Sequence, residues 1–350
     1  MRAQKRLPRL DINTNINHSP HVAILGAGAS KAACPQGDKS GQAIPLMNDL
    51  VHIAGLQDII DRHGLEYDGK NFEAAYNAWA TMGVHPDAIK QIQSRIEQYF
   101  HTLSLPLEAT IYDKMILGLR NKDLIATFNW DPFLAQAYQR NMDSVGHENM
   151  PRILFLHGNV MIGACADCRM KGWTNNPCDG CKKRLEPSTL LYPVGEKNYT
   201  EDPFIKSEWD ELRAYLEDAY LVTVFGYSAP ITDVVARSVL LEAWHNNPTS
   251  TLGNLDIIDT KPKEEIRENW SDFFEVSHHG IYKSISDNYF SLFPRRTCDA
   301  FAMATLQQDP WHENPLPETE DLAELQAWVQ HLVAEEKAGK FSGLPRDGRD

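Results

Sequence analysis

The sequence predicts an α/β protein built on a parallel sheet with helices on both faces. Three observations predict this class: apolar runs of strand length recur along the chain, helical patterns separate them, and glycine or polar residues follow each run. Strands that alternate with helices favour a parallel sheet. The crossover helix returns the chain to the end of the sheet where the previous strand began, so the next strand runs in the same direction. A chain of 350 residues can bury a substantial core, as one large domain or two unequal ones.

Five short runs have the length and composition of buried strands. Each is rich in Leu, Ile or Val and is bounded by glycine or by short polar residues. The predicted strands cover residues 21–25, 123–127, 152–156, 221–225 and 254–259.

Helical spacing of apolar residues fills the segments between these strands. Residues 46–120 form a predicted helical insertion, in which one helix opens near Pro106, since proline suits a first helical turn. Ser207 is the expected cap of a helix before the fourth strand, and a helix over 232–244 follows that strand. A last amphipathic helix starts at Thr319.

The domain organisation follows from these elements. The polar, Asn-rich start and the residues after the last helix predict a flexible and a disordered tail around one main domain. No apolar stretch follows the basic start and no run is long enough to span a bilayer, so we expect a cytoplasmic protein without a membrane partner. The expected boundaries are 1–20 for the first tail, 21–315 for the main domain, 46–120 for its helical insertion, 160–186 for a cysteine module, 316–337 for the last helix and 338–350 for the disordered tail.

Charge and cysteine usage narrow the possible ligands. The net charge of −14 argues against nucleic acid as the main ligand, because phosphate binding needs a concentrated positive surface.

Four of the six cysteines form two Cys-x-x-Cys motifs, nine residues apart, a spacing typical of a zinc site rather than of disulfides. Four thiolates leave zinc no open position, so we expect a structural ion. The predicted ligands are Cys165, Cys168, Cys178 and Cys181.

A glycine-rich turn, Gly-Ala-Gly-Ala-Ser, follows the first predicted strand. Glycines at such a turn let a diphosphate approach the backbone where the next helix begins. The strict dinucleotide pattern has a further glycine where this chain has Lys31, so a purely steric role of the glycines stays an alternative. The candidate cofactor contacts are Gly26, Ala27, Gly28, Ala29 and Ser30.

Polar side chains follow the second and third strands, at the edge where open parallel sheets hold ligands. Thr127, Asn129 and Asp131 follow the second strand. The short side chains of Asn129 and Asp131 can point into one crevice, or can cap the next turn instead. His157, beside Gly158, follows the third strand and suits general-base work, although a histidine here can also be structural.

The fourth and fifth strands end in the same way. Gly226, Tyr227 and Ser228 follow the fourth strand and allow close approach of a phosphate or ribose. Asp259 ends the fifth strand, where it can accept hydrogen bonds from a ribose diol or cap a turn. This recurrence predicts a Rossmann-like sheet that holds a dinucleotide along one edge.

The order of these motifs resembles the sirtuin family over about two thirds of the chain. The shared elements are Gly-Ala-Gly-x-Ser, Thr-x-Asn-x-Asp, His-Gly, the cysteine pairs and Gly-x-Ser. The resemblance implies NAD as cosubstrate and cleavage of its nicotinamide–ribose bond. Carried over to matching positions, the family's roles would fall to Gly28 and Ser30 at the diphosphate, Asn129 and Asp131 at the nicotinamide ribose and amide, His157 as general base, and Gly226 and Ser228 at the adenosine side.

Two departures resemble a divergent bacterial branch of the family. Deacylating sirtuins carry Gly-Ile-Pro-Asp-Phe-Arg after the glycine turn, whereas residues 43–48 read Ala-Ile-Pro-Leu-Met-Asn, and no arginine occurs between residues 9 and 62. Residues 226–230 together with Asp233 look like bacterial sirtuin-like proteins, several of which are NAD glycohydrolases in anti-phage defence.

The leading hypothesis is therefore hydrolysis of NAD to nicotinamide and ADP-ribose, with Asn129, Asp131 and His157 as catalytic residues. NAD-dependent lysine deacylation is the alternative, which the four-cysteine module favours. A third hypothesis, an NAD- or ADP-ribose-sensing scaffold without turnover, is weakened because Asn129 and His157 are both present. Many relatives work in oligomers or with a partner, so the resemblance extends to a homo-oligomer or an activating partner protein.

Overall fold

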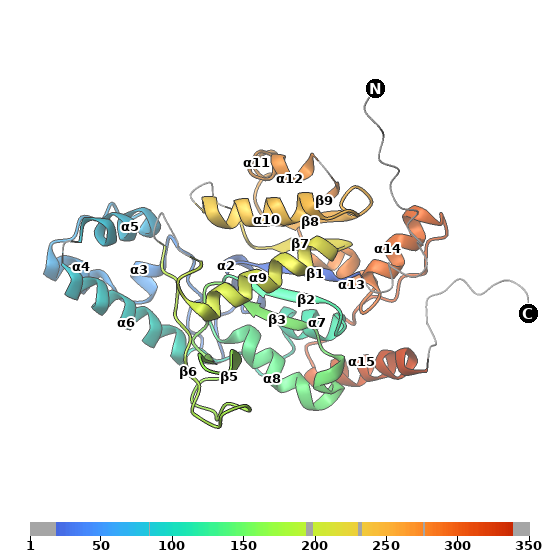
Figure 1. The fold of residues 1–350 in the computed structure, drawn as a ribbon, viewed down its shortest axis with the longest axis horizontal. Coiled ribbons are helices and arrows are strands. Elements are labelled where there is room, and N and C mark those ends of the chain that lie inside the picture. Colours follow the sequence, from blue (N-terminus) through green and yellow to red (C-terminus); the bar gives the residue numbers. More distant parts are fainter. Residues whose placement is uncertain (1–18, 84, 194–198, 230–232, 276, 339–350) are drawn as a thin grey trace, which may run out of the picture.

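The computed structural model describes residues 19–83, 85–193, 199–229, 233–275 and 277–338, so most of both predicted tails lies outside the described residues. Its centre is a sheet of six strands: β1 (His21–Leu25), β2 (Leu124–Thr127), β3 (Arg152–Phe155), β7 (Leu221–Phe225), β8 (Asn254–Ile258) and β9 (His278–Tyr282). Their order is β3-β2-β1-β7-β8-β9, and every neighbouring pair runs parallel (Figure 1). The predicted α/β class is confirmed.

The strand order creates a switch point between β1 and β7. From there β2 and β3 extend the sheet to one side, and β8 and β9 extend it to the other. Open α/β sheets hold their ligands at such a point, outside the carboxyl ends of the strands. Strand β9 is absent from the predictions because its sequence, His-His-Gly-Ile-Tyr, has no apolar run; it is a partly exposed edge strand.

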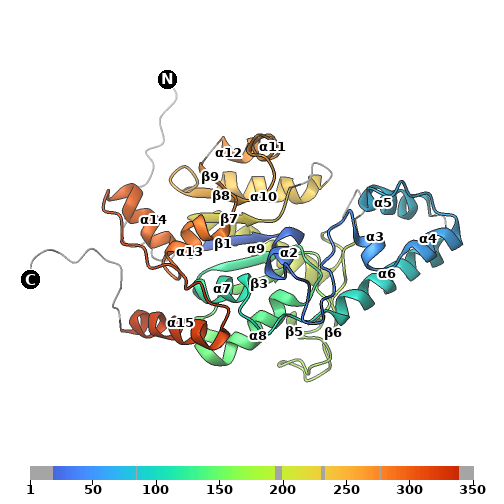
Figure 2. The same ribbon diagram turned by 180° about the vertical axis from the view of Figure 1, so that it is seen from behind.

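Helices cover both faces of the sheet (Figures 1 and 2). Alternate residues of β1 show this arrangement: Ala23 and Leu25 belong to one apolar cluster, whereas Val22 and Ile24 belong to another. The first cluster includes α2 (Ala27–Ala33), α7 (Ile111–Gly118), α8 (Phe133–Val145) and α15 (Leu322–Lys337); the second includes α9 (Pro203–Asp218), α10 (Val234–Asn246), α11 (Lys263–Asn269) and α12 (Ser271–Phe274).

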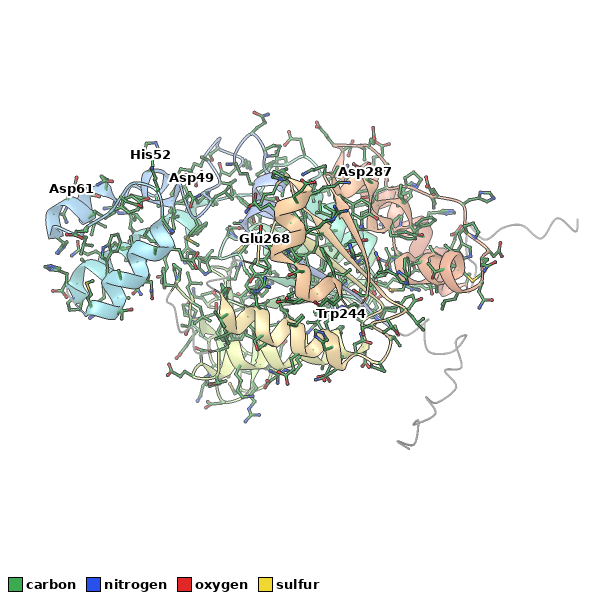
Figure 3. The ribbon with its side chains drawn as sticks, turned by 90° about the horizontal axis from the view of Figure 1, so that it is seen from above. Asp49, His52, Asp61, Trp244, Glu268 and Asp287 are labelled. Atoms are coloured by element: carbon green, nitrogen blue, oxygen red, sulfur yellow. The ribbon has the colours of Figure 1, made fainter. Side chains whose placement is uncertain are left out.

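The helical insertion stands at one end of the molecule (Figure 1). Seen from above, its residues Asp49, His52 and Asp61 lie far from Trp244 and Asp287 (Figure 3). It contains α3 (Leu50–Ile53), α4 (Gln57–His63), α5 (Phe72–Met82) and α6 (Pro86–Thr102); the remaining short helices are η1 (His147–Asn149), η2 (Ile285–Asp287), α13 (Tyr289–Leu292) and α14 (Thr297–Leu306). None of the helices in the described part of the chain combines the length and apolar character needed to cross a membrane.

One predicted helix start, near Pro106, is wrong. Helix α7 begins at Ile111, because Thr110 and Asp113 form a capping box. In this box Asp113 Oδ2 accepts from the Thr110 amide at 2.7 Å, while the Thr110 side chain caps the first turn. The cap fixes the start more strongly than the preference of proline for a first turn.

Aspartate caps also displace two other predicted starts. Helix α9 begins before Ser207, because Asp202 Oδ1 accepts from the amides of its first turn at 2.8 and 3.0 Å. Helix α15 is capped by Asp321 rather than by Thr319. The predicted start of α10 at residue 232 lies outside the described residues.

The cysteine module is a separate three-stranded antiparallel sheet. It consists of β4 (Ile162–Cys165), β5 (Met170–Trp173) and β6 (Glu186–Pro187). Its own apolar cluster contains the cysteines Cys165, Cys168 and Cys178 and one other side chain, Leu185. So small a core cannot by itself hold a three-stranded sheet together.

An ion pair, not a further strand, closes the sheet edge at β3. Glu208 Oε2 on α9 accepts from the Phe155 amide at 2.8 Å, and Lys171 Nζ on β5 donates to Ile153 O at 2.7 Å. Lys171 and Glu208 also pair at 2.7 Å, with side-chain exposures of 18% and 3%. They satisfy backbone groups that an open edge would offer to another chain.

We expect Glu208→Ala to destabilise the protein by about 3 kcal/mol, because it leaves the mostly buried Lys171 ammonium and the buried Phe155 amide without their shared partner. Urea unfolding measures the loss. Glu211→Ala, one turn later on α9, is the control: its pair with Arg152 is more exposed, so the expected change is below about 1 kcal/mol. Equal urea midpoints for the two variants would contradict the role of the buried pair.

Candidate active site

A cavity of about 500 Å³ lies where the carboxyl ends of five parallel strands meet. Nearly all the predicted site residues line it, although they come from five separate segments. The structure therefore confirms that these motifs converge. The predicted residues on its wall are Gly26, Ala27, Gly28, Ser30, Asn129, Asp131, His157, Gly226, Tyr227, Ser228 and Asp259.

Two predicted cofactor contacts do not line the cavity. Ala29 lies on the buried side of α2 and is fully buried in the apolar core. Thr127 is also buried, and its Oγ1 accepts from the Asn129 amide at 3.0 Å. Thr127 thus shapes the turn that carries Asn129, and it offers its hydroxyl to the protein itself.

Two glycine loops pack directly against each other at the switch point. The Gly26 amide donates to Phe225 O and the Gly28 amide donates to Gly226 O, both at 3.0 Å. A Cβ on Gly26 would lie 2.5 Å from Gly226 O, and one on Gly28 would lie 2.8 Å from Gly226 Cα. Gly226 itself has a φ of +64°. The steric role is therefore real, and the glycines also line the cavity.

The Asn129 side chain is oriented by three acceptors. Its Nδ2 lies 2.9 Å from Gly26 O, 2.9 Å from Ser30 Oγ and 3.2 Å from Tyr112 Oη. The hydrogens of the amide nitrogen therefore bind groups of the protein. Within the described part of the chain, no group donates a hydrogen bond to Oδ1. Because Oδ1 is an acceptor, Asn129 can orient a water molecule or a hydroxyl in the cavity.

Ser30 and Asp131 form the floor beside Asn129. Ser30 Oγ donates to Asp131 Oδ2 at 2.5 Å and lies 2.7 Å from Tyr112 Oη. The hydroxyl predicted to flank a diphosphate is therefore already engaged, and Ser30 positions its neighbours instead. Burial raises the pKa of Asp131 to about 6, although Ser30 and the Phe133 amide favour the ionised form.

His157 lies in an aromatic wall and is 7% exposed. Its ring packs edge-on against Phe128, with centroids 4.8 Å apart, and Phe128 stacks on Tyr227 at 4.2 Å. On another side, Nε2 lies 3.2 Å from the Tyr199 hydroxyl, and the two rings are nearly parallel. The imidazole is therefore fixed in orientation at the end of β3.

Sequence reasoning missed several residues of this site. Tyr112 lies on α7 and Glu73 on α5, so neither follows a strand, and no signal pointed to them. Asn159 had a usable signal, because it stands two residues after His157 in the same turn. Its Nδ2 donates to Asp131 O at 2.6 Å and so ties the turns after β2 and β3 together.

The four predicted zinc ligands converge. Their Sγ atoms all lie within 4.8 Å of one another, and Cys165 Sγ lies 3.6 Å from Cys181 Sγ. Tetrahedral zinc with bonds of about 2.3 Å needs sulfurs about 3.8 Å apart, so the cluster fits a four-thiolate ion. A Cβ on Gly180 would lie 2.8 Å from Cys168 Sγ, which explains the glycine between the last pair.

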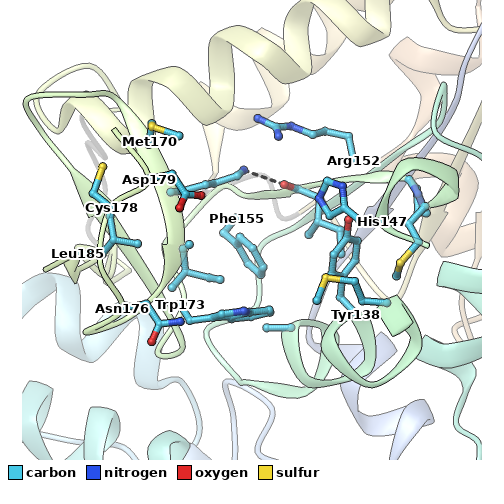
Figure 4. A pocket seen from close by; sticks show the side chains of 18 of the residues that line it. Tyr138, His147, Arg152, Phe155, Met170, Trp173, Asn176, Cys178, Asp179 and Leu185 are labelled. Carbon is cyan, nitrogen blue, oxygen red and sulfur yellow. Dashed lines mark hydrogen bonds between the residues drawn. The ribbon is translucent and has the colours of Figure 1, made fainter. Parts of the chain in front are cut away.

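A second cavity, of about 660 Å³, lies between the cysteine module and β3 with α8 (Figure 4). Aromatic rings of Tyr138, Phe155 and Trp173 face it, and Cys178 forms part of its wall. It contains none of the residues that follow the ends of the parallel strands. It is the larger of the two, and its wall also contains an imidazole, an amide and carboxylates, but none of these residues follows a strand of the parallel sheet: His147, Asn176, Glu148 and Asp179.

Comparisons with known proteins give weak matches. No protein-family model and no curated protein matches this chain. A solved structure described as "The Structural basis of Sirtuin Substrate Affinity" is 16% identical and covers 80% of this chain and 96% of its own, with a TM-score of 0.40. A Sir2 homolog–NAD complex is 13% identical and covers 91% and 93%, with a TM-score of 0.37. With scores below 0.5 the superpositions are loose, and nothing about this chain follows from them.

We expect Asp131→Asn to stabilise the protein at pH 7.5 by about 1–3 kcal/mol. Its pKa rises from the ordinary 3.8 to about 6 on folding, so between these values the folded state binds more protons than the unfolded state. Ionisation of Asp131 therefore lowers stability as pH rises from about 4 through 6. A neutral amide removes that cost and can still accept from Ser30.

Urea unfolding at pH 4 and at pH 7.5 measures this effect. The gain should be near zero at pH 4, where the carboxyl of the wild type is protonated in the folded state. Asp61→Asn, at an exposed position on α4, should change neither value. An equal gain at both pH values, or none at pH 7.5, contradicts the assignment.

We expect one zinc ion per chain, and we expect its removal to unfold the cysteine module alone. The reason is the small apolar cluster of that module, which makes metal binding and folding of the module one event. Cys178→Ser should lose the metal and the hydrogen-exchange protection of residues 162–187 while β1 stays protected. Cys34→Ser is the control, because Cys34 is buried far from the cluster in sequence and is not among its ligands. Retained protection in metal-free protein would refute the structural role.

Proposed function

We propose that this chain is a sirtuin-like enzyme that cleaves the nicotinamide–ribose bond of NAD and transfers the ADP-ribosyl group to water. One observation carries the proposal: a single cavity at the switch point unites the glycine turns, an oriented amide, a buried carboxylate and a buried imidazole. Their order along the chain is the order that resembles the sirtuin family. A cavity of about 500 Å³ falls in the range of small-molecule sites.

The strand order supports one direction for NAD. Asp259 follows β8 and suits the adenosine ribose, while the two glycine loops at β1 and β7 allow the diphosphate to approach the backbone. Asn129 and His157 follow β2 and β3, on the far side of the switch point. From β3 to β8 the sheet spans four strand spacings, about 19 Å, which suits an extended dinucleotide.

The charges on the cavity wall agree with this direction. Among the described residues that line it, Lys261 carries the one permanent positive charge, and it stands beside Asp259 at the proposed adenosine and diphosphate end. Glu73 and Asp131 line the cavity as well. Burial and Asp233 raise the pKa of Tyr199 most, and Glu73 adds to the increase, so Glu73 lies on the Tyr199 and His157 side of the cavity. Carboxylates there favour the cationic nicotinamide ring.

The proposed reaction needs few protein groups. The C1′–nitrogen bond of the nicotinamide riboside breaks with oxocarbenium character, and its electron pair leaves with the cationic ring, which is a good leaving group. Oδ1 of Asn129 orients the attacking water, whose oxygen bonds to C1′. His157 takes the proton of that water. A positioned base of this kind contributes about 10²–10⁴ to the rate.

The stretch after the glycine turn favours water over a peptide as the acceptor. Leu46, Met47 and Asn48 line the cavity at the place where deacylating relatives carry Asp-Phe-Arg. Two apolar side chains, Leu46 and Met47, and the neutral Asn48 in place of an arginine therefore change this part of the wall. Deacylation stays the second candidate, because the four-cysteine module lies beside the sheet at β3 (Figure 4). A role in anti-phage defence, an oligomer and an activating partner belong to the same proposal and rest on the resemblance alone. A cytoplasmic location, which the sequence already led us to expect, belongs to the proposal too.

We expect His157→Ala and Asn129→Ala each to lower NAD turnover by about 10²-fold or more while zinc content stays unchanged. Chromatography of the products after incubation with NAD, with and without candidate activators, measures turnover. His147→Ala and Asn176→Ala are matched controls, since both residues lie at the second cavity and should keep wild-type rates. Undiminished turnover in either site variant would refute the assigned role.

The products also separate the alternatives. Nicotinamide and ADP-ribose, formed without any peptide, support hydrolysis. Acetyl-ADP-ribose, formed only with an acetylated peptide, would instead establish deacylation. Tight NAD binding without release of nicotinamide would mean that the protein is a sensor.

A further inference from the structure

A chain of hydrogen bonds behind His157 joins three segments that are distant in sequence. Nε2 of His157 lies 3.2 Å from the Tyr199 hydroxyl, and this hydroxyl lies 3.0 Å from Asp233 Oδ1. All three side chains are buried, with exposed fractions of 7%, 5% and 5%. Tyr199 precedes α9 and Asp233 precedes α10, so the helices on one face of the sheet carry both groups to the histidine.

The direction of these hydrogen bonds follows from the number of hydrogens. The hydroxyl of Tyr199 has one hydrogen and two neighbouring acceptors. The Asp233 carboxylate is the stronger acceptor, because hydrogen bonds to ionised oxygens exceed those between neutral groups. The shorter of the two distances agrees. Tyr199 Oη must then accept from His157, which places the imidazole proton on Nε2 and the lone pair on Nδ1.

The neighbouring groups hold this arrangement in place. Burial and the Asp233 carboxylate raise the pKa of Tyr199, so its phenol keeps the hydrogen. Tyr227 donates to the other carboxylate oxygen, Oδ2, at 3.4 Å. The Tyr227 ring stacks on Phe128, which in turn packs against His157. Both oxygens of Asp233 are thus used, one of them toward the histidine.

Several other charged groups face these residues. Their own titration has to be separated from the effect of Tyr199 and Asp233 on the pKa of His157. They stay unchanged in every variant used below. They are Glu73 on α5, Asp131 after β2, Arg237 on α10, and Asp259 and Lys261 after β8.

We propose that Tyr199 and Asp233 are positioning residues that fix the proton of neutral His157 on Nε2 and stabilise the imidazolium formed when the ring takes a second proton. The inference rests on the proposed function, in which the proton of the attacking water passes to His157. The negative charge of Asp233, relayed through the Tyr199 hydroxyl, favours the charged ring over the neutral one. His157 touches the reacting atoms, and the other two residues act through it.

The test is ¹⁵N NMR of histidine-labelled protein, with the His157 signals assigned by their loss in His157→Ala. In the wild type, neutral His157 should show the Nε2–H form. In Tyr199→Phe and in Asp233→Asn that preference should weaken, and the imidazole pKa should fall. The acidic limb of the kcat profile should move to lower pH, and kcat should fall about ten- to a hundredfold with little change in KM. Tyr215→Phe, on α9 at the second cavity, is the control.

The NMR readout separates this inference from the proposed function. Unchanged tautomer and pKa in both variants would overturn the inference even if kcat fell, because a merely structural role predicts that result. If the wild type does not cleave NAD, the proposed function fails, while the tautomer and pKa still decide whether the residues position His157. If Tyr199→Phe does not fold, the nearly isosteric Asp233→Asn decides alone.

Discussion

The site depends on the close approach of two glycine loops at the switch point of the sheet. Gly26 and Gly28 on one loop and Gly226 on the other lie where any Cβ would overlap the opposite backbone. Two amide hydrogen bonds of 3.0 Å join the loops, so this approach is a fixed part of the fold. Because β1 and β7 are neighbours and run parallel, their outgoing loops must either pack or diverge here. The glycines allow them to pack while the turns after β2, β3 and β8 open into the cavity beside them.

The floor of the cavity is polar, and its groups satisfy one another. Asn129, Ser30, Asp131 and Tyr112 share a set of short hydrogen bonds, and Asn159 joins the two turns that carry them. Such a network costs stability when it contains a carboxylate that burial disfavours, as the raised pKa of Asp131 shows. Functional sites often keep groups that stability alone would not select. Because the amide nitrogen of Asn129 binds within this network, its side-chain oxygen Oδ1 stays the acceptor that Asn129 can offer to a ligand.

The sequence predicted the features that recur or that depend on spacing. Buried strands followed by small polar residues, and cysteines at fixed intervals, can be recognised without three-dimensional information. The sheet and the metal cluster could therefore be predicted from the sequence. Strand β9 was not, because a partly exposed edge strand lacks an apolar run. The role of Ser30 was also out of reach, since only the fold brings Tyr112 and Asp131 to its hydroxyl. Tyr199 stands on a segment without any strand-end signal, and a residue of this kind is found only when the helices are packed.

The most direct test of the central claim is a crystal structure of the His157→Ala variant with NAD bound. We expect the nicotinamide ribose over the turns after β2 and β3, within hydrogen-bond reach of Asn129, with the diphosphate at the two glycine loops and the adenosine ribose at Asp259. NAD bound in the opposite direction, or in the cavity beside the cysteine module, would contradict the claim.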